Sequence, residues 1–181
     1  MNGMNAFYTH QQYLIKELRK LDYSQDRLCL ELGSGDGSAS VFRGFLIDNP
    51  HLYVWALDAS EDWRDQIKRD YHHPNYEITL VRDWGIALDE GILNGMASKS
   101  PFDLVFIDQS PFDARIMSID ILGKYSKVIV LHDYDYFNKG VCENIFSVGE
   151  DSFFAKYAND FILEPHCMIL PPTLIMRNKN L

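Results

Sequence analysis

Five continuous apolar runs, separated by segments with helical spacing, constrain the fold of this chain more than any other feature. The runs are residues 27–33, 52–58, 76–81, 102–108 and 127–133. Strands of a parallel sheet are covered by helices on both faces, so they are apolar throughout rather than alternating. Strands that alternate with helices along a chain form such a sheet. The pattern therefore predicts a doubly wound α/β fold with a mostly parallel sheet and helices on both faces.

The segments outside these runs fit the same architecture. Apolar residues recur at intervals of three and four over residues 11–21 and 38–49, which predicts two helices, and residues 136–148 can form another. The C-terminal part offers two last strands joined at Pro171-Pro172. Two prolines do not suit a tight two-residue hairpin, so we expect a wider joint.

The first apolar run ends in a glycine-rich turn, ELGSGDGS, at residues 31–38. Such a turn between a strand and a helix lets a ligand approach the backbone closely, and it presents the positive end of the helix dipole. A triphosphate-binding loop needs Gly-Lys-Ser/Thr, and no lysine follows Gly33 at that spacing. The dinucleotide fingerprint G-x-G-x-x-G starts at Gly33 and Gly35 but meets Ser38 where its third glycine belongs. The turn therefore matches a dinucleotide site only in part.

Acidic residues in and beyond the turn indicate a ligand that carries positive charge. Glu31 and Asp36 would repel a pyrophosphate, whereas S-adenosylmethionine carries an ammonium and a sulfonium and no phosphate. Asp58 ends the second apolar run, where an acid accepts hydrogen bonds from ribose hydroxyls in nucleoside-binding sheets. Nucleotides and S-adenosylmethionine both need Asp58, but only S-adenosylmethionine explains Glu31 and Asp36.

Five motifs together, ELGSGDGS, ALDAS, VRDW, FDLVFIDQS and VIVLHDYDYF, extend from Leu28 over nearly the whole remaining chain. With them the chain resembles the class I S-adenosylmethionine-dependent methyltransferases. The resemblance implies a Rossmann-like, seven-stranded sheet with an antiparallel last strand and the cofactor across the carboxyl ends of the first strands. The chain departs from the family at residues 82–84, where Arg-Asp-Trp stands instead of a Gly-Asp-Ala type sequence.

The resemblance also implies roles for individual residues. Those expected at the methionine part of the cofactor are Glu31, Gly33, Ser34, Gly35 and Gly37. Asp58 is expected at the ribose, and Asp83 with Trp84 at the adenine, where the indole can supply a stacking face. Asp83 also suits a helix cap and Trp84 a core position. The remaining residues of the expected cofactor site are Asp36, Ser38, Ala59 and Asp108.

Polar residues follow the fourth and fifth apolar runs, and we expect the chemistry there. Methyl transfer is an in-line attack on a sulfonium methyl, so the protein must position the acceptor and handle its proton. Converging carboxylates raise one another's pKa unless a cation joins them, which predicts Asp108, Asp133 and Asp135 as ligands of a hard divalent ion such as Mg²⁺. This pattern is similar to metal-dependent O-methyltransferases. The alternative is His132 as a general base without metal, so the expected catalytic residues are Asp108, His132 and Asp133.

Three functions remain open at this point. The leading one is S-adenosylmethionine-dependent O-methylation of a small-molecule hydroxyl, with or without a divalent metal. The second is N-methylation of a protein or nucleic acid, since DQSPF at residues 108–112 is similar to the Asp/Asn-Pro-Pro-aromatic loop of amino-methyltransferases, although it holds one proline of the two. The third is a non-catalytic S-adenosylmethionine-binding or regulatory domain, since the chain carries little beyond the core sheet.

Composition restricts the kinds of molecule that we expect this chain to bind. The formal net charge is -9 and the basic residues are scattered, which disfavours a nucleic-acid partner and leaves a small-molecule acceptor. No apolar stretch approaches the roughly 18 residues of a membrane span, and the first residues do not have a signal-peptide layout, so we expect a cytoplasmic protein without membrane contact. Residues 1–181 are expected to form one domain, with 1–24 as an N-terminal helical arm. No particular oligomeric state is indicated.

Overall fold

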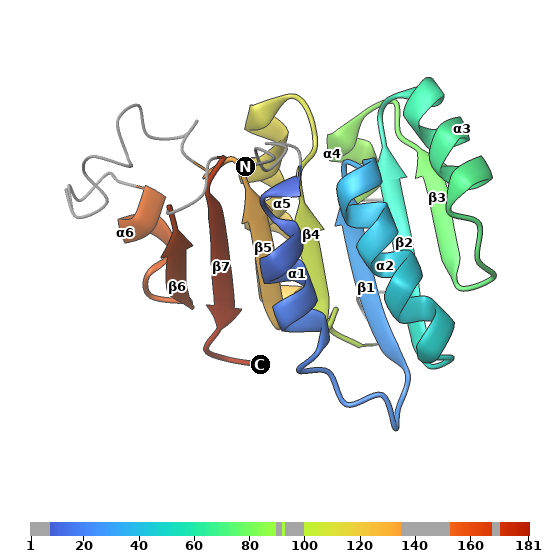
Figure 1. Ribbon diagram of the computed structural model, residues 1–181. Coiled ribbons are helices and arrows are strands. Elements are labelled where there is room, and N and C mark those ends of the chain that lie inside the picture. The colour runs from blue at the N-terminus through green and yellow to red at the C-terminus, as the bar shows by residue number, and fades with distance from the viewer. Residues whose placement is uncertain (1–7, 90–91, 93–99, 135–152, 168–170) are drawn as a thin grey trace, which may run out of the picture.

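The computed structural model describes residues 8–89, 92, 100–134, 153–167 and 171–181. Seven strands in this part of the chain form one sheet in the order β3-β2-β1-β4-β5-β7-β6 (Figure 1). They are β1 (Arg27–Leu32), β2 (Leu52–Asp58), β3 (Tyr76–Leu80), β4 (Leu104–Ile107), β5 (Val128–His132), β6 (Phe161–His166) and β7 (Thr173–Asn178). The strands from β3 to β5 pair in parallel, and β7 is antiparallel to both β5 and β6. The expected seven-stranded, mostly parallel sheet with an antiparallel last strand is confirmed.

The helices named in the described part of the chain are α1 (Gln11–Leu18), α2 (Asp36–Asp48), α3 (Glu61–Asp70), α4 (Trp84–Ile86), α5 (Phe112–Leu122) and α6 (Phe153–Tyr157), with a 3₁₀ turn at Gly123–Tyr125. The helix expected from residue 38 begins two residues earlier, inside the glycine turn. The helix expected at 136–148 and the expected metal ligand Asp135 lie outside the described residues.

The two faces of the sheet contribute to two separate hydrophobic cores because side chains alternate along each strand. In β4, Val105 and Ile107 belong to the core that includes Ile119 of α5, whereas Phe106 belongs to the core that includes Phe42 of α2. Figure 1 shows α1 and α2 in front of the sheet and α5 behind it. All four residues of β4 are buried, which explains its uninterrupted apolar sequence.

The order of the strands in the sheet produces a crevice in which a ligand can bind. After β1 the chain turns outward to β2 and β3, and it then returns to β4 on the other side of β1. The segments that leave the carboxyl ends of β1 and β4 therefore diverge, and a crevice opens between them. No helix among the described residues is long and apolar enough to cross a membrane.

Candidate functional site

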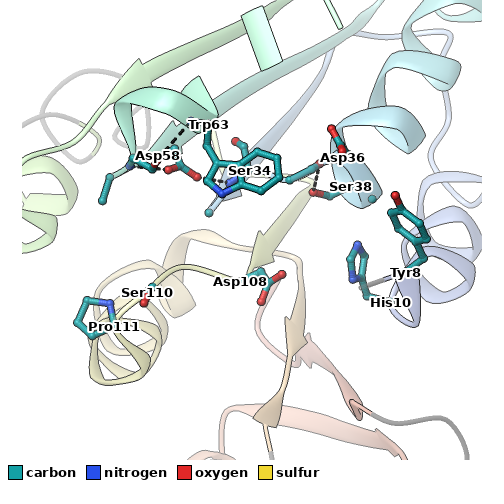
Figure 2. A pocket seen from close by; sticks show the side chains of 15 residues that line it. Tyr8, His10, Ser34, Asp36, Ser38, Asp58, Trp63, Asp108, Ser110 and Pro111 are labelled. Carbon is teal, nitrogen blue, oxygen red and sulfur yellow. Dashed lines mark hydrogen bonds between the residues drawn. The ribbon is translucent and has the colours of Figure 1, made fainter. Parts of the chain in front are cut away.

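A cavity of about 700 Å³ lies at the carboxyl ends of β1, β2 and β4. It is lined by Tyr8, His10, Gly33, Ser34, Gly35, Asp36, Gly37, Ser38, Asp58, Ala59, Ser60, Trp63, Asp108, Ser110 and Pro111. In Figure 2 the residues around the glycine turn lie along one side of this cavity, and Asp108 and the β4 loop lie along the other. Most of the residues expected to bind the cofactor are thus brought together, with Glu31, Asp83 and Trp84 as the exceptions.

Gly33 determines how closely the β1 and β4 loops approach each other. Its φ is +83°, in the left-handed region that favours glycine. A Cβ built on Gly33 would lie 2.6 Å from the backbone of Asp108 and of Gln109. Gly35, by contrast, has room for a Cβ, with nothing within 4 Å of it. The glycine turn therefore needs Gly33 for its own packing, while Gly35 leaves the cavity wall open to a ligand.

Asp58 joins the two loops that border the cavity. Its carboxylate accepts the backbone N–H of Ser34 and the backbone N–H of Ser60, each at 2.7 Å. Burial raises the pKa of Asp58, and the two hydrogen bonds lower it but offset the effect of burial only in part. An ionised carboxylate has about four acceptor sites, so two donors leave it able to accept two more. The remaining sites suit a pair of neighbouring hydroxyl groups, as a ribose presents.

Glu31 lies beneath the cavity rather than on its surface. It is completely buried in β1, accepts a hydrogen bond from the hydroxyl of Ser38, and accepts another from the hydroxyl of Tyr76. Burial raises the pKa of Glu31 to about 8, and its two hydrogen bonds only partly offset that effect. Burial therefore favours the protonated, uncharged form of Glu31, which reaches the cavity only through Ser38.

Two residues that sequence reasoning did not assign to the cofactor also line the cavity near Asp36. Trp63 in the first turn of α3 is 42% exposed and presents its indole to the cavity (Figure 2). Tyr8 comes from the segment before α1. Ser60 caps α3 by accepting the N–H of Trp63. Trp63 could have been recognised in the sequence as the aromatic residue three positions after the helix cap Ser60, just beyond the carboxyl end of β2.

A buried arginine that the sequence argument did not consider joins the acids at the ends of β4 and β5. Arg115 of α5 is 4% exposed, and its guanidinium lies 2.9 Å from Oδ1 of Asp108 and 3.6 Å from Oδ2 of Asp133. It also donates to the backbone carbonyls of Gln109, His132 and Asp108. Arg115 therefore places a positive charge beside two of the three acids that were expected to bind magnesium.

Two histidines complete this end of the cavity. Nδ1 of His132 lies 3.2 Å from Oδ1 of Asp108, and Nε2 of His132 lies 3.1 Å from Oγ1 of Thr9. The ring of His10 packs edge-on against the ring of His132, with centroids 4.6 Å apart. Burial lowers the pKa of His10 to about 4, with a further contribution from His132. His10 lines the cavity, whereas His132 lies behind Asp108.

No family model and no curated protein matches this chain. Solved structures do match it. Human methyltransferase-like protein 13, in complex with SAH, aligns at 13% identity over 95% of this chain and 79% of that one, with a TM-score of 0.59. An O-methyltransferase from Bacillus cereus, also in complex with SAH, aligns at 19% identity over 94% and 78%, with a TM-score of 0.57. A putative rRNA methylase from Clostridium thermocellum aligns at 14% identity over 98% of both chains, with a TM-score of 0.57.

The chain has the fold of the class I S-adenosylmethionine-dependent methyltransferases. In this methyltransferase fold the glycine turn, Asp58 and Asp108 all line one cavity. The likeness concerns the fold alone, since the identities are between 13% and 19%.

The residues expected at the adenine lie apart from the cavity of this methyltransferase fold. Asp83 caps α4, where its carboxylate accepts the N–H of Ile86. Trp84 is 7% exposed, belongs to a hydrophobic core, and donates its indole N–H to the carbonyl of Ser110. Trp84 thus holds the β4 loop whose residues Ser110 and Pro111 do line the cavity. A direct contact of either residue with adenine stays a prediction.

Proposed function

We propose that this chain is an S-adenosylmethionine-dependent methyltransferase that methylates a hydroxyl group of a small molecule. The observation that carries the proposal is the joint placement of Asp58 and the open backbone at Gly35 on one cavity of about 700 Å³. Cavities of this size are typical of small-molecule and cofactor sites. Two solved structures with the same fold hold SAH, which supports the same cofactor here.

The charge of the cavity wall favours S-adenosylmethionine over a dinucleotide. Asp36, Asp58 and Asp108 line the wall, and none of its described residues is lysine or arginine. The N–H of Ser34, which could have bound a phosphate, donates to Asp58 instead. A ligand with an ammonium and a sulfonium therefore gains from this wall, whereas a pyrophosphate is repelled.

Asp108 is the residue that we assign to the reacting groups. When bound, S-adenosylmethionine supplies a methyl group on a positively charged sulfur. Transfer of that methyl group to an acceptor oxygen would leave the electron pair on sulfur, giving SAH, and the hydroxyl proton would pass to the carboxylate of Asp108. Asp108 lines the cavity and can orient that hydroxyl, with its own position held by Arg115. His132 and Asp133 lie behind it as positioning residues.

The acceptor class is proposed from the same wall. A nucleic-acid backbone needs cationic side chains, and the described cavity residues include none, while the whole chain has a formal charge of -9. Aromatic residues such as Tyr8 and Trp63 line the cavity and suit a small organic acceptor.

A methyl-transfer screen tests this proposal. The purified chain is incubated with S-adenosylmethionine labelled on its methyl group, against hydroxylated metabolites, RNA, and denatured and native protein extracts. We expect label in the metabolite fraction and loss of that label in Asp108→Asn. Label in RNA or protein alone would replace the proposed acceptor class. Binding of S-adenosylmethionine without transfer to any fraction would instead favour a regulatory domain.

A further inference from the structure

We propose that His10, Asp108 and His132 form a binding site for one divalent transition-metal ion of the Zn²⁺ or Fe²⁺ class. The three residues come from the segment before α1, the end of β4 and the end of β5, and each offers a ligand atom within 4.8 Å of the others. This set shares only Asp108 with the magnesium ligands expected from sequence. It goes beyond the proposed methyl transfer, because metal binding can be measured without cofactor or acceptor.

His10 provides the first argument. Its side chain is 3% exposed, and neither ring nitrogen has a hydrogen-bond partner among the described residues. A buried polar group without a partner is costly, so native structures rarely leave one. The ring packs against Phe106 and His132, and His10 and Asp108 both line the cavity (Figure 2). Coordination to a metal ion would give one of these nitrogens a partner.

The tautomer of His132 provides the second argument. Oγ1 of Thr9 donates to the carbonyl of Pro171, which can only accept, so the same oxygen accepts from Nε2–H of His132. This bond leaves Nδ1 of a neutral His132 with its lone pair 3.2 Å from Oδ1 of Asp108. Two acceptors repel each other at that distance unless a proton or a cation is shared between them. Thr9 would then orient a metal-ligating imidazole in the usual way, from its other ring nitrogen.

The local charge balance provides the third argument. The carboxylates of Asp108 and Asp133 lie 2.9 Å and 3.6 Å from the guanidinium of Arg115. Asp36 and Asp58 add further negative charge along the same cavity. A cation at the proposed site is therefore attracted by its surroundings even though Arg115 is close.

The ligand types indicate which metal fits. Two imidazoles and one carboxylate suit Zn²⁺ or Fe²⁺ rather than Mg²⁺, which prefers oxygen ligands. Bonds of about 2.0–2.2 Å place neighbouring ligand atoms roughly 3 to 3.5 Å apart, so the side chains would have to close in modestly from the 4.8 Å limit. Because His10 and Asp108 line the cavity, the remaining coordination positions would face a bound acceptor. Lowering the pKa of an acceptor hydroxyl there is a role that rests on the proposed function.

The test measures metal binding to the full chain without an affinity tag. Protein stripped with chelator is titrated with Zn²⁺, Co²⁺ and Mg²⁺ by calorimetry, and the Co²⁺ form is examined by visible absorption. His10→Phe keeps a ring against Phe106 and His132 but removes both nitrogens. His132→Gln is the second variant. His51→Ala is the matched control, since His51 is exposed and pairs with Asp26 away from the cavity.

We expect one equivalent of Zn²⁺ or Co²⁺ per chain, with affinity lowered at least about tenfold in His10→Phe and His132→Gln and unchanged in His51→Ala. Thermal unfolding of His10→Phe without metal checks that the variant folds. Equal binding by the native chain and His10→Phe would overturn the proposal, as would binding of Mg²⁺ in preference to Zn²⁺. Absence of binding would overturn it as well. Binding of S-adenosylmethionine is measured separately in excess chelator, so the failure of the metal site and the failure of the proposed function can be told apart.

Discussion

The guanidinium of Arg115 lies 2.9 Å from Oδ1 of Asp108 and also donates to the backbone carbonyl of His132, so one side chain ties the end of β4 to the end of β5. Its stacking over the ring of Phe112, with 4.5 Å between the guanidinium carbon and the ring centroid, keeps it in place. The acidic end of the cavity therefore depends on a buried cation that belongs to the protein itself.

Arg115→Met should destabilise the fold strongly. The substitution removes the guanidinium from beside Asp108 and Asp133 and takes away a donor from three carbonyl oxygens, and breaking a buried ion pair from one side costs about 3–5 kcal/mol. Urea unfolding followed by circular dichroism measures the change. Arg69→Met serves as the control, because Arg69 is exposed and its substitution should change the free energy of unfolding by no more than about 0.5 kcal/mol. Equal effects of the two variants would contradict the structural role of Arg115.

Asp58→Ala should weaken binding of S-adenosylmethionine and of SAH by about 1–3 kcal/mol, because the ribose hydroxyls would lose their buried acceptor. The variant also frees the N–H groups of Ser34 and Ser60, so thermal unfolding must accompany the binding measurement. Calorimetry with SAH gives the affinity. Asp62→Ala, which removes an exposed acid from the first turn of α3, should bind as the native chain does. Unchanged affinity in a folded Asp58→Ala would remove Asp58 from the cofactor site.

Gly33→Ala and Gly35→Ala should have opposite consequences. At Gly33 the left-handed φ costs an alanine roughly 1–2 kcal/mol, and its Cβ would meet backbone at 2.6 Å, so stability should fall. At Gly35 the extended backbone accepts alanine and nothing lies within 4 Å, so stability should hold while SAH binding weakens. Parallel thermal unfolding and calorimetry of both variants test the pair. Normal SAH binding in Gly35→Ala would show that the ligand does not approach this backbone.

Glu31 should make the fold less stable as pH rises. Its pKa is raised from an ordinary 4.5 to about 8 in the folded chain, so the folded state holds a proton that the unfolded state has released. The stability due to this group is complete below about pH 4.5 and is lost progressively as pH rises to about 8. Glu31→Gln keeps an acceptor for Ser38 and should flatten this decline. Denaturant unfolding at a series of pH values compares the two chains; identical slopes would show that Glu31 is not the group responsible.

The sheet could be predicted from the sequence because strands that are buried on both faces appear there as uninterrupted apolar runs. Each residue of β4 is buried, and its apolar run stands in the sequence without interruption. Gly33 and Asp58 could be predicted for a similar reason, since a strand-to-helix turn and an acid at the end of β2 are defined by their nearest neighbours. The sequence by itself thus determined the strands, the glycine turn and the acid that faces it.

The tertiary structure decided how the acids are paired and which side chains reach the cavity. Thr9 and His132 are 123 residues apart and meet only because α1 packs against the sheet beside β4 and β5. The packing of the helices and strands, which no local pattern encodes, buries Glu31 beneath the cavity and Trp84 in a hydrophobic core. The same packing leaves Trp63 on the cavity wall. Nothing in the local sequence of α5 distinguishes Arg115 from an ordinary helix residue. Its role follows from the crossing of α5 behind β4 and β5, which removes its charge from water and leaves Asp108 and Asp133 as its partners.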